Sequence, residues 1–102
     1  EHLEEHIKIK IAISLRRLLV IKKNLSISKI EKSEIVKSYN DIALNADIRK
    51  ATVSNSFNAI TEPKAGTLIL IIEAMGFKLQ DFADIFYNLN EGDINNFKKS
   101  KR

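Results

Sequence analysis

The sequence predicts an all-α fold, a compact bundle of about five helices. Apolar residues recur at the three- and four-residue intervals of an α-helix along most of the chain. Turn residues are scarce, because the chain has three Gly and one Pro among its 102 residues, and a β-sandwich needs many more turns. The apolar fraction of 44% suffices for one modest core. We therefore expect a single helical domain over residues 1–89.

An amphipathic helix is expected over residues 3–23. Leu3, Ile7 and Ile11 recur every four residues, which places them on one side of a helix. Acidic residues stand near its beginning and basic residues near its end, as the helix dipole favours. Asn24 is expected to end the helix, because asparagine tolerates left-handed backbone.

Residues 39–58 predict two short helices joined by a tight turn. Asp47 can adopt the left-handed backbone that such a turn requires. Val53 and Phe57 form the apolar stripe of the second helix, and Ile60 is expected to continue this stripe into the core. The pair is therefore a predicted helix-turn-helix.

The segment before this pair is the hardest to assign. Residues 27–37 look like an insertion, and their apolar spacing fits a short helix and an extended segment equally well. Ser38 is the predicted N-terminal cap of the following helix, because its hydroxyl can accept a hydrogen bond from a free backbone N–H.

Two further helices are expected after residue 60. Pro63 lies in a loop over residues 61–66, which a nearly all-apolar and therefore buried helix over 67–75 follows. Gly76 is expected to end that helix in left-handed backbone, with Phe77 packing back against it.

The last helix is predicted over residues 78–89, with Tyr87 exposed. One side of it carries Leu79, Phe82, Ile85, Phe86 and Leu89. Residues 90–102 are polar and end in basic residues, so they are expected to form a disordered, solubilising tail.

Residues at fixed spacing carry a family resemblance. Counted from the first residue of 39–58, the fifth, ninth, tenth and fifteenth residues are Ala43, Asp47, Ile48 and Val53. Downstream, the same pattern continues with Pro63, Thr67, Leu68, Ile71, Ile72, Ala74, Met75 and Gly76. Over about residues 38–82 the sequence thereby resembles the Cro/Xre-type (lambda-repressor-like) helix-turn-helix regulators. It departs from their pattern at four positions. Asp47 stands where glycine is usual, and Arg49 stands where a serine or threonine usually caps the second helix. Ser56 stands where an apolar residue is usual, and Phe57 stands where an acidic residue is usual.

The resemblance implies a sequence-specific DNA-binding transcriptional regulator, expected to be a repressor, that inserts residues 49–58 into the major groove. The side of this helix opposite its apolar stripe has side chains that can bind base edges, and the preceding helix can direct its N-terminus at a phosphate. The residues expected to contact DNA are Tyr39, Asn40, Arg49, Lys50, Ala51, Ser54, Asn55, Asn58 and Lys64.

Double-stranded DNA is thus the expected partner, and the chain is expected to act as a homodimer. Two sets of residues have no partner in the expected bundle and could form the dimer interface, Leu3 with Ile7, or Ile85 with Phe86 and Leu89. The alternative is an antitoxin or another protein-interaction module that uses the same helices to hold a protein partner such as a toxin.

Composition and motifs limit the other classes of function that the sequence allows. A net charge of +4 permits nucleic acid as a partner without requiring it. The absence of Cys excludes disulfides and thiolate metal sites and suits the cytoplasm, and no membrane span or signal segment is evident. No nucleophile–base pair or phosphate-binding loop is present, so no enzyme and no cofactor are expected. His2, Glu5 and His6 spell a metalloprotease-like string, but no third ligand follows and no metal is expected.

Overall fold

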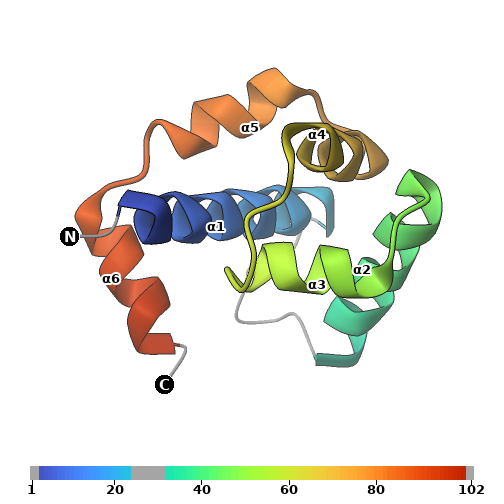
Figure 1. Cartoon of the computed structure of the whole chain (residues 1–102), viewed down its shortest axis with the longest axis horizontal. Helices are drawn as coiled ribbons and strands as arrows, with labels where there is room; N and C mark the ends of the chain where they lie inside the picture. The colour runs from blue at the N-terminus through green and yellow to red at the C-terminus, as the bar shows by residue number, and fades with distance from the viewer. Residues whose placement is uncertain (1–2, 24–31, 101–102) are drawn as a thin grey trace.

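The computed structural model describes residues 3–23 and 32–100, which form six helices and contain no strand (Figure 1). The helices are α1 (Leu3–Lys23), α2 (Lys32–Ala46), α3 (Lys50–Phe57), α4 (Ala65–Ala74), α5 (Leu79–Phe86) and α6 (Glu91–Ser100). The predicted all-α class is confirmed, with six helices rather than five. None of these helices is long and apolar enough to cross a membrane.

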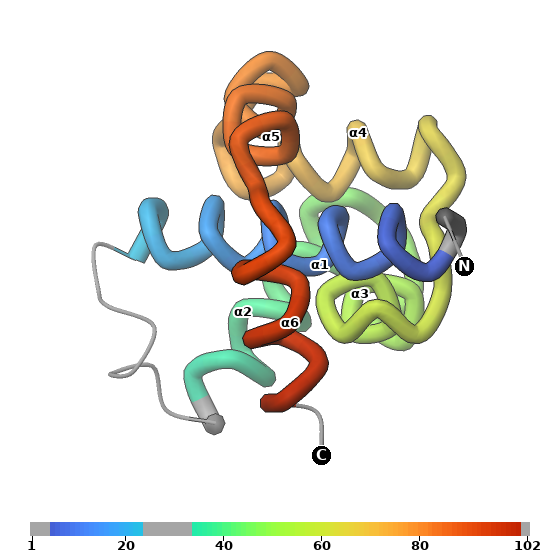
Figure 2. The backbone as a smooth tube through the Cα atoms, turned by 90° about the vertical axis from the view of Figure 1, so that its left-hand side faces the viewer, coloured from blue at the N-terminus to red at the C-terminus, as the bar shows by residue number. Residues whose placement is uncertain are grey.

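Helix α1 is the central element of the fold. It packs against α3, α5 and α6, while α2 packs against α3 and α4. In both views α5 lies above α1 and α3 lies below it, and Figure 2 shows α6 crossing α1. The bounds of α1 agree with the prediction, and its apolar side chains between Ile9 and Leu19 are buried because several helices cover them.

The main core lies where α1 meets α2, α3 and α4. Its fully buried residues include Leu15, Leu18, Val53, Phe57, Ile71 and Ile72. A second, smaller cluster joins α1 to α6 through Ile9, Ala12, Ile13, Ile94 and Phe97. Because α1 contributes to both clusters, it connects the α2–α3 pair with the C-terminal helix.

Helix α2 begins earlier than expected. It begins at Lys32 and includes Ser38, which is buried inside the helix and caps nothing. Ile35 packs against the main core, so the described part of the predicted insertion belongs to the bundle. The start of that segment and Asn24 lie outside the described residues.

The predicted ending of α4 is confirmed. Gly76 has a φ of 89°, and its N–H donates to the Glu73 carbonyl at 2.9 Å. The Phe77 N–H donates to the Ile72 carbonyl at 3.2 Å, and the Phe77 ring packs against the main core. The expected burial of α4 on most sides is only partly met, because Leu70 is exposed.

Helix α5 ends sooner than predicted, at Phe86, and uses its apolar side to cover α1. Phe82 is buried, and Lys10 of α1 lies 4.4 Å from the centre of the Phe86 ring. Leu79 is exposed at the start of the helix, and Tyr87 is exposed as predicted.

The prediction of a disordered tail is wrong, because residues 91–100 form α6. Ile94 and Phe97 are buried against α1. The Asp93 N–H donates to Asn90 Oδ1 at 2.9 Å, and the Asn90 N–H donates to Asp93 Oδ2 at 3.0 Å. This reciprocal pair is a capping box, which satisfies backbone donors that the start of a helix otherwise leaves free.

Candidate nucleic-acid interface

The chain reverses between α2 and α3 in a short left-handed turn. Asp47 has a φ of 58°, as the sequence predicts for this position. The Ile48 N–H donates to the Ala43 carbonyl at 3.0 Å, and the Asp47 N–H donates to the Leu44 carbonyl at 3.3 Å. These two bonds close the end of α2, and Ile48 packs against the main core. The position of α3 relative to α2 is therefore fixed by hydrogen bonds and by packing.

The inner side of α3 consists of its three buried residues, Val53, Ser56 and Phe57. The Phe57 ring lies 4.8 Å from the Tyr39 ring of α2, centre to centre. Ser56 Oγ donates to the Thr52 carbonyl at 2.8 Å, so this hydroxyl is satisfied although it is buried. A serine at a usually apolar position is thus accommodated within the helix itself.

The end of α3 is held by α1. Arg16 Nε donates to the Phe57 carbonyl and Arg16 Nη2 donates to Asn58 Oδ1, each at 2.8 Å. Asn58 Nδ2 in turn donates to the Ser54 carbonyl at 2.8 Å. Burial lowers the pKa of the Arg16 guanidinium from its usual value, and the nearby Tyr39 opposes this effect. The cation nevertheless suits a helix C-terminus, where free carbonyls carry partial negative charge.

The chain leaves α3 through another left-handed residue, Ala59, with a φ of 58°. The Ile60 N–H donates to the Asn55 carbonyl at 2.9 Å. The left-handed residue breaks the helical period, so Ile60 turns away from the stripe that Val53 and Phe57 begin. Ile60 is 57% exposed, and the prediction that it faces the core is wrong.

The outer side of α3 carries most of the residues predicted to contact DNA. Arg49, Lys50 and Ala51 are exposed at its beginning, and Ser54 and Asn55 are half-buried along it. The Asn55 side chain has no hydrogen-bond partner among the described residues. Helix α3 contains no acidic residue, so no carboxylate of its own opposes a polyanion at this surface. Lys64 is exposed just before α4.

Three predicted contact residues lie elsewhere than expected. Tyr39 is only 8% exposed and belongs to the main core. Burial raises the pKa of its phenol, whereas the nearby Arg16 and a hydrogen bond with Asn58 act to lower this pKa. Since α2 begins at Lys32, neither Tyr39 nor the exposed Asn40 opens a helix toward a phosphate. Asn58 links the end of α3 to Arg16.

Comparisons of the chain with protein-family models, with curated proteins and with solved structures found no match. The chemistry of the α2–α3 surface is therefore the guide to function. Among the described residues, no group of three or more His, Asp or Glu side chains converges as metal ligands, and His2 lies outside them.

Sequence reasoning gave Arg16 only a weak claim to DNA contact and did not predict its bonds to the end of α3, because basic residues on the first helix are usually plain surface. It lies 41 residues before its partner Phe57. No local pattern could reveal this contact, which depends on how α1 and α3 pack against each other.

Proposed function

We propose that the chain is a sequence-specific DNA-binding transcriptional regulator that uses α2 and α3 as a helix-turn-helix and inserts α3 into the major groove. The observation that carries the proposal is the division of α3 into two sides. Its buried side holds it rigidly on α1 and α2, and its outer side presents basic, hydroxyl and amide groups without an acid. A rigid helix with such a surface matches what major-groove reading requires.

The outer residues of α3 divide by chemistry into two roles. Arg49 and Lys50, at the beginning of the helix, are suited to phosphate oxygens, which position a protein on DNA without reading sequence. Ser54 and Asn55 can form hydrogen bonds with base edges, and an asparagine can bond adenine through two groups at once. Ala51 offers a methyl group to the methyl of thymine. Asn55 is the strongest candidate for base reading, because the rest of the described chain leaves its amide unengaged.

Lys64 is proposed as a phosphate contact outside α3. It lies at the end of the loop that joins α3 to α4, and it is exposed. The net charge of +4 supports such contacts, since each lysine or arginine that neutralises a phosphate releases a condensed counterion.

The decisive experiment starts with selection of preferred sites from random DNA duplexes. We expect Asn55→Ala to lower the preference for the selected site by ~1–3 kcal/mol, because it removes a two-bond base contact. Its affinity for random DNA should change little. Both affinities are measured by fluorescence anisotropy at fixed salt concentration. An unchanged ratio of specific to random-DNA affinity would show that Asn55 does not read a base.

Lys64→Ala is the matched control, since both residues lie outside the core. It should weaken binding to specific and random DNA together and flatten the salt dependence by about one unit of slope. If substitutions at Arg49, Ser54 and Asn55 leave every DNA affinity unaltered, the DNA-binding proposal fails. A protein-binding module such as an antitoxin, with a toxin as its partner, then takes its place.

A further inference from the structure

Helix α3 is too short to hold its shape alone. It has eight residues, and isolated helices shorter than about 12–15 residues are marginal in water. Arg49 forms no side-chain cap at its beginning, and no basic residue stands in its last turn. The geometry of the surface that α3 presents must therefore come from contacts with other helices.

The end of α3 is held by one side chain of α1. Arg16 uses two nitrogens, since Nε donates to the Phe57 carbonyl and Nη2 donates to Asn58 Oδ1, each at 2.8 Å. Because a guanidinium only donates, the Asn58 oxygen must face Arg16. The Asn58 amide nitrogen is thereby turned back toward α3, where it donates to the Ser54 carbonyl at 2.8 Å. Arg16 thus fixes both the last turn of α3 and the orientation of the amide that follows it.

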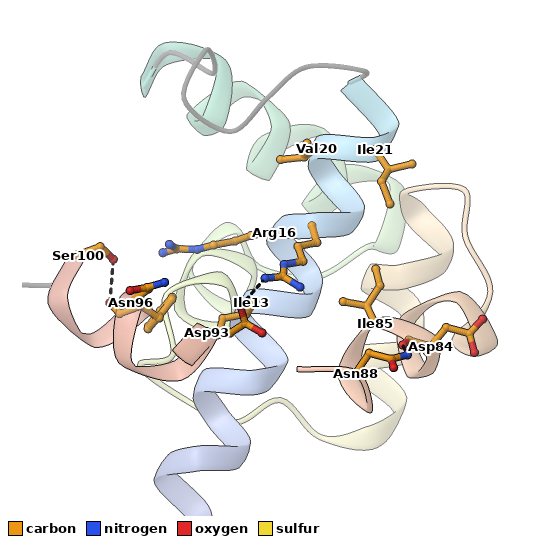
Figure 3. Close-up of a pocket in the computed structure, with 12 residues that line it drawn as sticks. Ile13, Arg16, Val20, Ile21, Asp84, Ile85, Asn88, Asp93, Asn96 and Ser100 are labelled. Atoms are coloured by element: carbon orange, nitrogen blue, oxygen red, sulfur yellow. Dashed lines mark hydrogen bonds and ion pairs between the residues drawn. The ribbon is translucent and has the colours of Figure 1, made fainter. Parts of the chain in front are cut away.

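Helix α6 supports the guanidinium that makes these bonds. In Figure 3 the Arg16 side chain extends from α1 toward α6, on the side away from Ile85. The guanidinium carbon lies 4.6 Å from the centre of the Phe97 ring of α6, within the limit of about 6 Å for a cation–π contact. Ala59, the left-handed residue after α3, packs against the cluster to which Phe97 belongs. Helix α6 therefore supports the end of α3 twice, through Arg16 and through Ala59.

Both residues proposed to read bases depend on this end of the helix. The Asn55 carbonyl accepts from the Ile60 N–H at 2.9 Å, a bond that requires the reversal made by Ala59. The Ser54 carbonyl accepts from the backbone N–H of Asn58 at 3.1 Å and from its side-chain amide. The backbone of Ser54 and Asn55, and with it the direction in which their side chains leave the helix, is thus set from the end of α3.

We propose that Arg16 is the positioning residue of α3 and that α6, by supporting Arg16, belongs to the DNA-reading unit. This inference rests on the proposed function. Arg16 acts through Ser54 and Asn55 rather than by touching a base. An ordered surface loses less entropy on binding, and a displaced amide cannot form two bonds with one base. Sequence preference therefore depends on a helix that lies outside the helix-turn-helix.

The first test needs no DNA. Hydrogen exchange of the ¹⁵N-labelled chain is followed by NMR in the parent protein and in Arg16→Lys. A lysine keeps the charge but has one nitrogen in place of the two that Arg16 uses. We expect the backbone amides of Asn58 and Ile60 to exchange roughly tenfold faster, because local opening of the α3 end becomes easier. The amides of Ile48 and Phe77, which donate to carbonyls of α2 and α4, should keep their rates.

The second test measures the ratio of specific to random-DNA affinity by fluorescence anisotropy, with the site selected from random duplexes. Arg16→Lys should lower this ratio roughly fivefold or more, the lower limit of what one two-bond base contact contributes. Affinity for random DNA should stay within about twofold, because the net charge is unchanged. Arg17→Lys is the matched control and should leave the ratio unaltered, since it makes the same exchange at the adjacent arginine, which pairs with Asp93.

Phe97→Leu tests the contribution of α6. It keeps an apolar side chain in the cluster but removes the aromatic ring from the Arg16 guanidinium. We expect it to lower the affinity ratio and to speed exchange at Asn58 by roughly twofold or more, as loss of a cation–π contact implies. Ile94→Val is the control, because it also shortens a buried side chain of α6 but leaves the Phe97 ring in place.

Several results would overturn the proposal. Unaltered exchange at Asn58 and Ile60 in Arg16→Lys would refute positioning by Arg16. Equal acceleration of all four amides would show a general loss of stability instead of specific support. Faster exchange with an unchanged affinity ratio would refute the link to base reading. An effect of Phe97→Leu no larger than that of Ile94→Val would exclude α6 from the reading unit.

Failure of the DNA-binding proposal gives a different result. The parent protein then shows no preferred DNA site, and the role of Arg16 in reading fails with it. The exchange rates, measured without DNA, still decide whether Arg16 and α6 position the end of α3.

Discussion

Arg16 is the residue at which three helices meet. From α1 it donates hydrogen bonds to the end of α3, and its guanidinium lies over the Phe97 ring of α6. Its neighbour Arg17 points to Asp93 and makes an exposed ion pair, of a kind that typically contributes little to stability. Two adjacent arginines thus have different tasks, which their order in the sequence does not reveal.

At the residue scale, the left-handed conformation of Ala59 gives a prediction about stability. An alanine with a φ of 58° costs about 1–2 kcal/mol relative to right-handed backbone, whereas glycine avoids this cost. Glycine loses about 0.5–1 kcal/mol through its greater freedom in the unfolded chain. We therefore expect Ala59→Gly to raise the free energy of unfolding by about 0.5–1 kcal/mol, measured by urea denaturation followed by circular dichroism.

The contrasting variant is Ala59→Val, because a β-branched residue fits left-handed backbone worse than alanine does. It should lower the free energy of unfolding. If Ala59→Gly is the less stable protein instead, the contact of the Ala59 methyl with the Ile9–Ala12–Ile13 cluster outweighs the backbone cost.

At the element scale, α6 shows what periodicity cannot detect. Its buried contribution comes from Ile94 and Phe97 amid polar residues, so it has no continuous apolar stripe. Two weaker signals were present in the sequence. Asn90 and Asp93 have the spacing of a capping box, and Ile9 and Ile13 widen the apolar side of α1 beyond what one neighbour covers. Both signals are recognisable only once α6 is placed on α1.

Asp93 makes the stability of α6 dependent on pH. The hydrogen bond from the Asn90 N–H, reinforced by Arg17, lowers the pKa of the Asp93 carboxyl below its usual 3.8. The folded state thus binds this proton less readily than the unfolded state does, so the stabilisation is complete above the usual value. It fades as the pH falls below that value toward the lower pKa of the folded state.

We therefore expect the stability advantage of the parent protein over Asp93→Asn to shrink on acidification from about pH 6 to about pH 3. The measurement is urea denaturation of both proteins at several pH values. A difference that stays constant over this range would show that the carboxylate charge does not support the start of α6.

The packing of α6 is tested by Phe97→Ala. Phe97 is buried between α6 and α1, so the substitution should lower the free energy of unfolding by about 3 kcal/mol, as for other large-to-small core changes. Lys99→Ala, at an exposed position of the same helix, should stay within about 0.5 kcal/mol of the parent. Equal stability of all three proteins would restore the interpretation of residues 90–102 as a tail.

At the scale of the whole molecule, the sequence predicted the helices that local rules define and missed what distant contacts decide. The turn at Asp47 and the ending at Gly76 follow from backbone preferences, and both are confirmed. The burial of Tyr39 and the direction of Ile60 depend on how α3 settles against α1 and α2, and both were predicted wrongly. The residues on the outer side of α3 could be predicted from helical geometry, because the residues of the buried inner side determine which residues lie opposite them.

A homodimer remains the prediction at this scale, since one helix-turn-helix reads few base pairs and two-fold dimers commonly bind inverted repeats. One of the two predicted interfaces consists of Ile85, Phe86 and Leu89, which are partly buried within the fold. Ile7, which is 40% exposed at the start of α1, is the better remaining candidate.

Light scattering at high micromolar concentration should therefore give twice the chain mass of 11.6 kDa without DNA, and the mass of two chains plus one duplex with the selected DNA. Ile7→Glu should reduce the dimer, because a charged group at an apolar interface loses hydration without gaining a partner. Leu44→Glu, an equally drastic change at an exposed position of α2, is the control and should leave the mass unchanged. A strict monomer under both conditions would contradict the prediction. Loss of the dimer in Leu44→Glu alone would move the interface from α1 to α2.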